Sequence, residues 1–296
     1  MSAADGTVGA HVKVVNNGPG GRRWDLVILG DGYRAGQLRR FHDDVEAFHS
    51  QVLKTTPPFD ELWPAINVHR VDVTSTDSGA DDPRTCADDE PGSPGGTGAT
   101  ARTFFDATFC DPRWRTRRLL TVNDALAKRV ARRKVRLFNQ VLVLVNTSEL
   151  VPTSQYGGSG GQVAVSSNMS AAQVALHELG HSAFGLADEY EADGPAEGPA
   201  EPRQPNVTRN TDRATNKWRH LVEATTPMPT SCNDGCPHCR PPAAPAPPDV
   251  VGAYEGAQYQ HCDFYRPFPD CYMRGNFVFC PVCARVIRKT LEQFLL

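Results

Sequence analysis

Two histidines four residues apart, with a glutamate beside the first, have the types and spacing of a catalytic zinc site. The segment reads His177-Glu178-Leu179-Gly180-His181, which is the pattern H-E-x-x-H. In an α-helix, residues i and i+4 lie on the same face, so both imidazoles can bind one ion. Glu178 lies next to the first ligand, where its carboxylate can act on a water activated by the metal. The spacing therefore predicts zinc ligands at His177 and His181 and a general base at Glu178.

A catalytic zinc ion also needs a third protein ligand and one open position. Gly185 offers a place for the helix to end, because glycine adopts the left-handed conformation without penalty. Asp188 follows three residues later, and we expect it to be the third ligand. Glu189 is the alternative. The acid that does not bind the metal is expected to orient its neighbours.

The elements that must position these residues can also be read from the sequence. Ser170 is an expected N-cap, and good helix formers follow it up to the first histidine. The apolar run 140–145 predicts a buried strand, and 161–166 a short strand directly before the helix. Hydrophobic periodicity and turn residues predict further strands and helices. The strands are at 12–15, 24–29 and 65–73, and the helices at 37–53, within the basic stretch 113–136, and at 283–296.

Composition limits the classes of partner. The chain has 296 residues and a formal net charge of −3, which does not favour a nucleic-acid partner. The basic residues of 113–136 are expected to form the solvated face of an amphipathic helix. No apolar run is long enough to span a membrane, and residues 1–6 lack the basic start and apolar core of a signal peptide.

Nine cysteines indicate either cross-links or a second metal site. Cys232, Cys236 and Cys239 form one closely spaced group, and Cys280-x-x-Cys283 forms another. Both spacings suit disulfides or structural zinc, and His238 could add a ligand to the first group. Cys86 and Cys110 flank the loop-like segment 76–100 and are expected to be able to pair. Because nine is odd, at least one thiol stays outside any intramolecular disulfide.

The zinc motif and other segments, from about residue 26 to the C-terminus, resemble the bacterial IgA-specific metalloendopeptidase family. This is a family of zinc peptidases with a zincin fold. The resemblance rests on these segments: 29–33 (Leu-Gly-Asp-Gly-Tyr), 67–71, 78–81, 156–161 (Tyr-Gly-Gly-Ser-Gly-Gly), 205–208, 217–218, 254–259, 265–267 (Tyr-Arg-Pro), 271–274 (Cys-Tyr-Met-Arg) and 279–283 (Phe-Cys-Pro-Val-Cys). Segments 191–205 and 232–248 depart from the family pattern and have the character of insertions.

The resemblance implies an α+β, zincin-like and metzincin-like fold with a mixed twisted sheet, an active-site helix and a loop-rich C-terminal lobe. We expect a single catalytic domain, 1–296, with an N-terminal lobe at 1–186 and a Cys-rich C-terminal lobe at 187–296. Metzincins place the third ligand three residues after the helix-ending glycine, which selects Asp188, although Gly185 follows the second histidine by four residues instead of three. Met273 is the expected methionine of the turn beneath the zinc.

The implied activity is zinc-dependent endopeptidase cleavage of a protein or peptide through a metal-activated water. The resemblance does not imply that immunoglobulin A is the substrate. Tyr265 is the expected donor to the oxyanion of the reaction, with Tyr190 as the alternative. The strand at 161–166 is expected to be the exposed edge of the sheet, where an extended substrate can add. Tyr156, Gly157, Gly158 and Gly161 would then form a flexible rim of the cleft, or else only a tight connection.

The oxidising context that the family implies favours secretion, and it favours disulfides over a second, structural zinc ion at the cysteine cluster. Within the C-terminal lobe, Cys280 and Cys283 are expected to bridge, with Cys271 or Cys262 among the partners. Two other functions remain open at this stage. One is a non-catalytic binding protein on a zincin scaffold, and the other is a zinc hydrolase acting on a non-protein amide.

Overall fold

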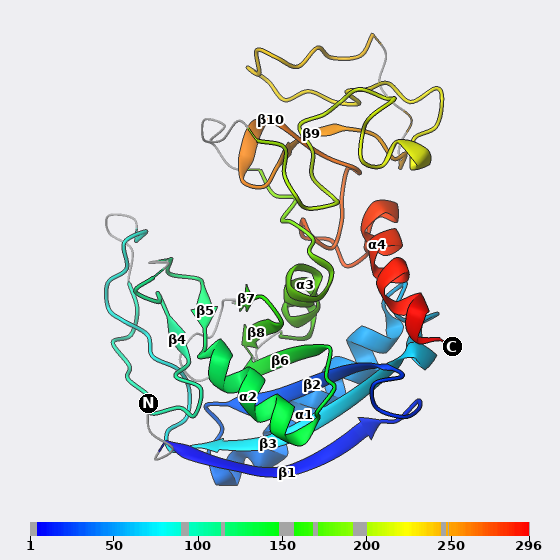
Figure 1. Cartoon of the computed structure of the whole chain (residues 1–296). Coiled ribbons are helices and arrows are strands. Elements are labelled where there is room, and N and C mark those ends of the chain that lie inside the picture. The colour runs from blue at the N-terminus through cyan, green and yellow to red at the C-terminus, as the bar shows by residue number, and fades with distance from the viewer. Residues whose placement is uncertain are drawn as a thin grey trace. The chain divides into compact units, whose positions relative to one another are not determined.

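A six-stranded mixed sheet lies at the centre of the N-terminal part of the chain in the computed structural model (Figure 1). The strand order is β1-β3-β2-β6-β8-β7. The four inner strands are parallel, and the two edge strands, β1 and β7, run antiparallel to their neighbours. The strands are β1 (Gly6–Val15), β2 (Trp24–Asp31), β3 (Ile66–Ser75), β6 (Gln140–Val145), β7 (Gly157–Gly160) and β8 (Val163–Ser167).

The structure describes residues 5–89, 95–113, 116–147, 157–167, 171–191, 200–243, 247 and 249–295. The chain divides into two compact units. Unit 1 consists of Met1–Thr55, Phe59–Ala183 and Leu291–Leu296, and unit 2 of Thr56–Pro58 and Phe184–Thr290.

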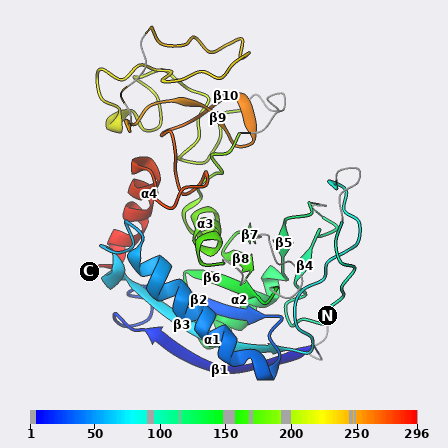
Figure 2. The same cartoon turned by 180° about the vertical axis from the view of Figure 1, so that it is seen from behind.

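The inner strands are buried because helices cover both faces of the sheet. Every residue of β2 and of β6 is buried, as expected for parallel strands with near-continuous apolar runs. Figures 1 and 2 show α1 (Leu38–Ala47) and α2 (Asp124–Lys134) on opposite faces. On the α2 face, Val27 and Leu29 of β2 share one core with Val130. Each such side chain contributes roughly 1.5–3 kcal/mol to stability by its burial. The helix predicted at 37–53 is observed as four consecutive helical segments. They are the 3-10 helix η1 (Ala35–Gln37), α1, the π-helix η2 (Phe48–Val52) and the 3-10 helix η3 (Leu53–Thr55).

The basic helix expected within 113–136 is shorter than predicted. It begins at Asp124, where the Asn123 side chain accepts a hydrogen bond from the backbone N–H of Leu126 at 3.1 Å. Leu120 is fully buried, and the stretch before the helix forms β5 (Leu120–Thr121), which pairs with β4 (Thr108–Phe109). Arg117 forms ion pairs with acids of the preceding loop instead of lying on a helical face. The basic stretch 113–136 thus contains two elements, strand β5 and helix α2.

The prediction that 161–166 forms the exposed edge of the sheet is wrong. The strand observed there, β8, lies between β6 and β7, and β7 is the edge. A short turn joins β7 to β8, and Gly161 in this turn has a φ of 60°, a left-handed conformation that favours glycine. Gly157 and Gly158, which were expected in a flexible rim, lie within β7. Tyr156, the remaining rim residue, lies outside the described residues.

Unit 2 is mostly loops, as predicted for the region after the zinc motif. Its regular elements are the hairpin β9 (Tyr254–Ala257) with β10 (Gln260–Arg266), and helix α4 (Pro281–Leu291). The chain continues into η6 (Glu292–Phe294), so the predicted terminal helix is present and begins two residues earlier than expected. Two further short 3-10 helices are η4 (Trp63–Ala65) in unit 1 and η5 (Arg219–Leu221) in unit 2. Among the described residues, none of the helices has both the length and the apolar character that crossing a bilayer requires.

Candidate metal centre

Helix α3 (Ala171–Phe184) carries the zinc motif. Ala175, Leu176 and Leu179 are fully buried and anchor one side of the helix. The helix ends at Phe184, directly before Gly185, whose φ of 65° is the left-handed conformation that ends many helices. The glycine therefore terminates the helix at the residue that the sequence predicts.

The two histidines converge as a metal site requires. Nε2 of His177 and Nε2 of His181 are 3.1 Å apart, and the two rings lie nearly perpendicular, at 84°. Zinc–nitrogen bonds of about 2.0–2.1 Å in tetrahedral geometry place two nitrogens about 3.3 Å apart. A carboxylate oxygen of Glu178 lies within 4.8 Å of one ring nitrogen of each histidine. These donors fit one zinc ion, with the carboxylate close enough to act on a water beside it.

Exposure differs between the donors and the base. Both histidines are half-buried, whereas Glu178 is 9% exposed. The last turn of the helix is fastened to the sheet, because Ser182 Oγ donates to the Glu178 carbonyl at 2.9 Å and accepts from Gln140 Nε2 at 2.7 Å. The site thus combines reachable histidines with a shielded carboxylate on a fixed helix.

The segment that follows the helix belongs to unit 2 and is held there by hydrogen bonds. The Asn206 side chain bonds both the N–H and the carbonyl of Ala187, at 2.8 and 2.9 Å. The backbone N–H of Gln258 donates to the Asp188 carbonyl, and the Tyr259 hydroxyl donates to Asp188 Oδ2 at 2.7 Å. Asp188 is half-buried. Its carboxylate is therefore oriented by a tyrosine that the sequence analysis did not single out, although Tyr259 lies in the segment 254–259 that carries the family resemblance.

Glu189 has a different environment from its neighbour. It is fully buried, and its Oε1 accepts hydrogen bonds from Asn206 Nδ2 at 2.9 Å and from Cys283 Sγ at 3.4 Å. Burial, and then the nearby Cys271, raises the pKa of Glu189 well above its usual range. The two adjacent acids, Asp188 and Glu189, therefore lie among different partners.

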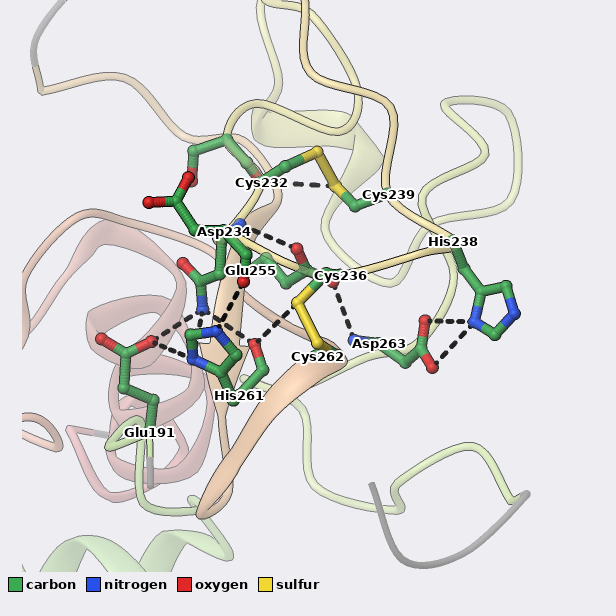
Figure 3. Close-up of a disulfide and its surroundings, with 12 residues drawn as sticks. Glu191, Cys232, Asp234, Cys236, His238, Cys239, Glu255, His261, Cys262 and Asp263 are labelled. Carbon is green, nitrogen blue, oxygen red and sulfur yellow. Dashed lines mark hydrogen bonds and ion pairs between the residues drawn. A yellow bond between two sulfur atoms is a disulfide. The ribbon is translucent and has the colours of Figure 1, made fainter. Parts of the chain in front are cut away.

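The cysteines fall into two classes. Six form disulfides: Cys86–Cys110 in unit 1, and Cys232–Cys239 and Cys236–Cys262 in unit 2. The expected pairing of Cys86 with Cys110 is confirmed. Figure 3 shows the two disulfides of unit 2 close together beside the hairpin strand, with His238 directed at Asp263 at 3.2 Å. The first cysteine group is thus cross-linked and its thiols are not available to a metal.

The second class corrects the prediction for the C-terminal lobe. Cys280 and Cys283 do not bridge to Cys271 or to Cys262, and all three of Cys271, Cys280 and Cys283 are free and buried. Cys262 pairs instead with Cys236, whose Cα lies 5.4 Å away, within normal disulfide range. The free thiols lie together with Glu189, a grouping that sequence spacing alone does not reveal.

Two further predicted residues lie in unit 2. Met273 is fully buried in a turn in which the N–H groups of Arg274 and Gly275 donate to the Cys271 carbonyl, and its own carbonyl accepts from the Glu189 N–H at 2.8 Å. Tyr265 is buried on β10 against Cys239. Burial, followed by the charges of nearby carboxylates, raises the pKa of Tyr265 above its usual range. Its hydroxyl is therefore a donor that stays protonated.

A comparison with known protein families covers most of the chain. A family model described as IgA Peptidase M64 matches residues 12–236 and 243–291. No curated protein matches the chain. The matched residues include α3, the segment after it and eight of the nine cysteines, all but Cys239. Because the match covers most of the sequence, the chain belongs to the IgA peptidase M64 family of metallopeptidases.

Proposed function

We propose that this protein is a zinc-dependent endopeptidase with a zincin-like fold. The observation that carries the proposal is the convergence of the His177 and His181 ring nitrogens at 3.1 Å, with Glu178 beside them on the same helix. His177 and His181 would hold the metal. The mixed sheet that precedes the helix and the loop-rich unit that follows it support the zincin-like assignment. We also propose that the lobes 1–186 and 187–296 form a single catalytic domain.

Bound zinc would lower the pKa of a water molecule and polarise the scissile carbonyl. Glu178 takes the proton from that water as it attacks the carbonyl carbon, and passes the proton to the leaving amine. Glu178 as a whole residue is 9% exposed, which limits the access of bulk water to the base. Gln140 and Ser182 keep the helix in place on the sheet, so the base stays at a fixed position.

Asp188 is the third ligand in this proposal. Its carboxylate accepts a hydrogen bond from the Tyr259 hydroxyl, and such a partner commonly orients a metal-binding carboxylate. Glu189, the alternative, lies fully buried among cysteine thiols, which favours Asp188. Met273 remains the proposed methionine of the turn, and Tyr265, before Tyr190, the proposed donor to the oxyanion.

The substrate class is a protein or peptide. We propose that an extended substrate adds to the edge strand β7, since an edge strand presents main-chain groups to which a peptide can pair. Gly157 and Gly158 lie on this strand, and Gly161 turns the chain back into β8. Together with Tyr156, they form the proposed rim of the cleft.

The test is substitution of the base. Glu178→Gln keeps the size of the side chain and removes its ability to take a proton, so cleavage of an unfolded protein substrate should fall by about 10³-fold. Zinc content and circular dichroism should match those of the wild type. Glu292→Gln, at an exposed glutamate near the C-terminus, is the matched control and should leave activity unchanged. Full activity in the zinc-loaded Glu178→Gln variant would refute the proposed role.

A further inference from the structure

Four buried side chains in unit 2 form a second set of metal donors. The sulfurs of Cys271, Cys280 and Cys283 and a carboxylate oxygen of Glu189 all lie within 4.8 Å of one another. Their exposed fractions are between 0% and 3%. Tetrahedral zinc with bonds of about 2.3 Å to sulfur separates its ligand atoms by about 3.8 Å. A small contraction around an ion would therefore bring this set to zinc geometry.

The backbone around the cysteines already donates to their sulfurs. The N–H of Cys280 donates to Cys271 Sγ at 3.3 Å, and the N–H of Cys283 donates to Cys280 Sγ at 3.5 Å. Cys280 immediately precedes α4, whose first residue is Pro281. The N-terminal end of a helix favours negative charge. The two N–H groups favour the thiolate form of Cys271 and Cys280, and thiolate is the form in which cysteine binds metals.

The carboxylate of Glu189 has one oxygen still to be satisfied. Oε1 is bonded by Asn206 and Cys283, whereas Oε2 is buried and has no hydrogen-bond partner among the described residues. A buried polar atom without a partner costs about 1–3 kcal/mol. Arg266, which is largely buried, places a positive charge near this carboxylate and would offset part of the negative charge of the ligand set.

We propose that Glu189, Cys271, Cys280 and Cys283 bind one zinc ion as a closed structural site. Three thiolates and one carboxylate are a ligand set suited to tetrahedral zinc. All four positions are filled by protein and all four residues are buried, so the site leaves no place for a substrate. Asn206 and the backbone N–H groups are its outer hydrogen-bonding partners, which fix the ligands as such partners do in other zinc proteins.

This zinc would join Glu189 to two segments far from it in the sequence. It ties Glu189 to the turn containing Cys271 and Met273, and both to the start of α4. The bond from the Glu189 N–H to the Met273 carbonyl, at 2.8 Å, already links the first two. Because Asp188 directly precedes Glu189, the ion would also fix the position of Asp188. This last step rests on the proposed function, whereas the zinc site itself does not.

The experiment removes the histidine ligands and counts the remaining metal. Zinc per chain is measured by elemental analysis after exhaustive dialysis, in the wild type, in His177→Ala/His181→Ala, and in that variant with Cys283→Ser added. We expect about two, about one and no zinc ions respectively. Cobalt in place of zinc in the double variant should give thiolate-to-cobalt charge-transfer absorption. The double variant Cys86→Ser/Cys110→Ser, which removes sulfurs from a disulfide, is the control and should keep both ions.

Each failure has its own signature. One zinc in the wild type and none in the histidine variant would overturn the structural site and leave the proposed function standing. One zinc in both the wild type and the histidine variant would overturn the proposed catalytic site and leave the structural site standing. A disulfide found by mass spectrometry between any two of Cys271, Cys280 and Cys283 would also overturn the site. Should Cys283→Ser not fold, Glu189→Gln can be added to the histidine variant in its place. A chelator should then remove the remaining zinc at a concentration about 10–100-fold lower than the histidine variant alone requires.

Discussion

The zinc motif on α3 and the cysteine cluster of unit 2 show two ways of arranging metal donors in one chain. On α3, two half-buried histidines converge beside a shielded glutamate. In the cluster, three buried thiols and a carboxylate oxygen of the buried Glu189 lie within 4.8 Å of one another. A catalytic ion needs an open position, whereas a structural ion is enclosed by protein. In the two proposed sites, access to the donors would separate a catalytic from a structural role as much as the chemical type of the donors does.

The largest expected effect separates activity from stability. His181→Ala should abolish cleavage, by at least about 10³-fold, because it removes a metal ligand, and it should change the urea midpoint little. Cys271→Ser should lower the free energy of unfolding by at least about 3 kcal/mol, because a structural zinc contributes directly to folding. Activity assays and urea unfolding of both variants provide the test. Equal losses of stability in the two variants would erase the distinction between the sites.

A second effect separates the two classes of cysteine. The Cys86–Cys110 disulfide closes a loop with a sequence separation of 24 residues, so the double variant Cys86→Ser/Cys110→Ser should be less stable by about 3 kcal/mol. Its zinc content and its activity at low temperature should be unchanged. Thermal unfolding and metal analysis measure the two quantities. Loss of zinc from this variant would mean that metal binding by the cysteine cluster of unit 2 depends on the Cys86–Cys110 disulfide.

A third prediction compares two buried carboxylates. Asp31 is fully buried, with Oδ2 unpartnered among the described residues, and burial raises its pKa from 3.8 to about 6. Below pH 4 this carboxyl is protonated in both the folded and the unfolded chain, and the raised pKa changes nothing. As pH rises from 4 to 6, the unfolded chain loses its proton first, so the folded state loses up to about 3 kcal/mol of stability.

Asp31→Asn has no such titration, so its stability relative to the wild type should increase between pH 4 and pH 6 and then level off. Urea unfolding at several pH values measures this difference. A constant difference across that range would show that the proton does not satisfy Asp31. Glu189 in the metal-loaded protein should give no comparable step, since there the ion takes the place of the proton.

The smallest effect concerns the proposed third ligand. Tyr259→Phe removes the hydroxyl that donates to Asp188, and should weaken zinc binding at the α3 site by about 10-fold. Competition with a chelator, followed by activity, measures this change. Tyr254→Phe is the matched control, because that hydroxyl donates to the Val250 carbonyl instead. An equal effect of both variants would indicate a general loss of stability and no specific support of Asp188.

Local pattern predicted the parts of the molecule in which neighbours in sequence are neighbours in space. The spacing of His177 and His181 predicts their convergence because one helical turn brings them together. The continuous apolar run of β6 likewise predicts a buried strand. Pairing between distant segments was predicted correctly only for Cys86 with Cys110, which flank a single loop. The match of Cys236 with Cys262 and the placement of β7 outside β8 depend on tertiary contacts that no local period encodes. Glu189 is the clearest case, since only the fold shows that it lies together with three cysteine thiols.

The division of nine cysteines into six cross-linked and three free has a consequence for how the protein matures. Thiol–disulfide exchange selects partners by reach and reactivity, and Cys280 and Cys283 lie close enough in sequence to be captured by an oxidant early. Metal uptake and oxidation therefore compete for the same sulfurs while the chain folds. Refolding with zinc present before the oxidant should give the native pattern in higher yield than the reverse order.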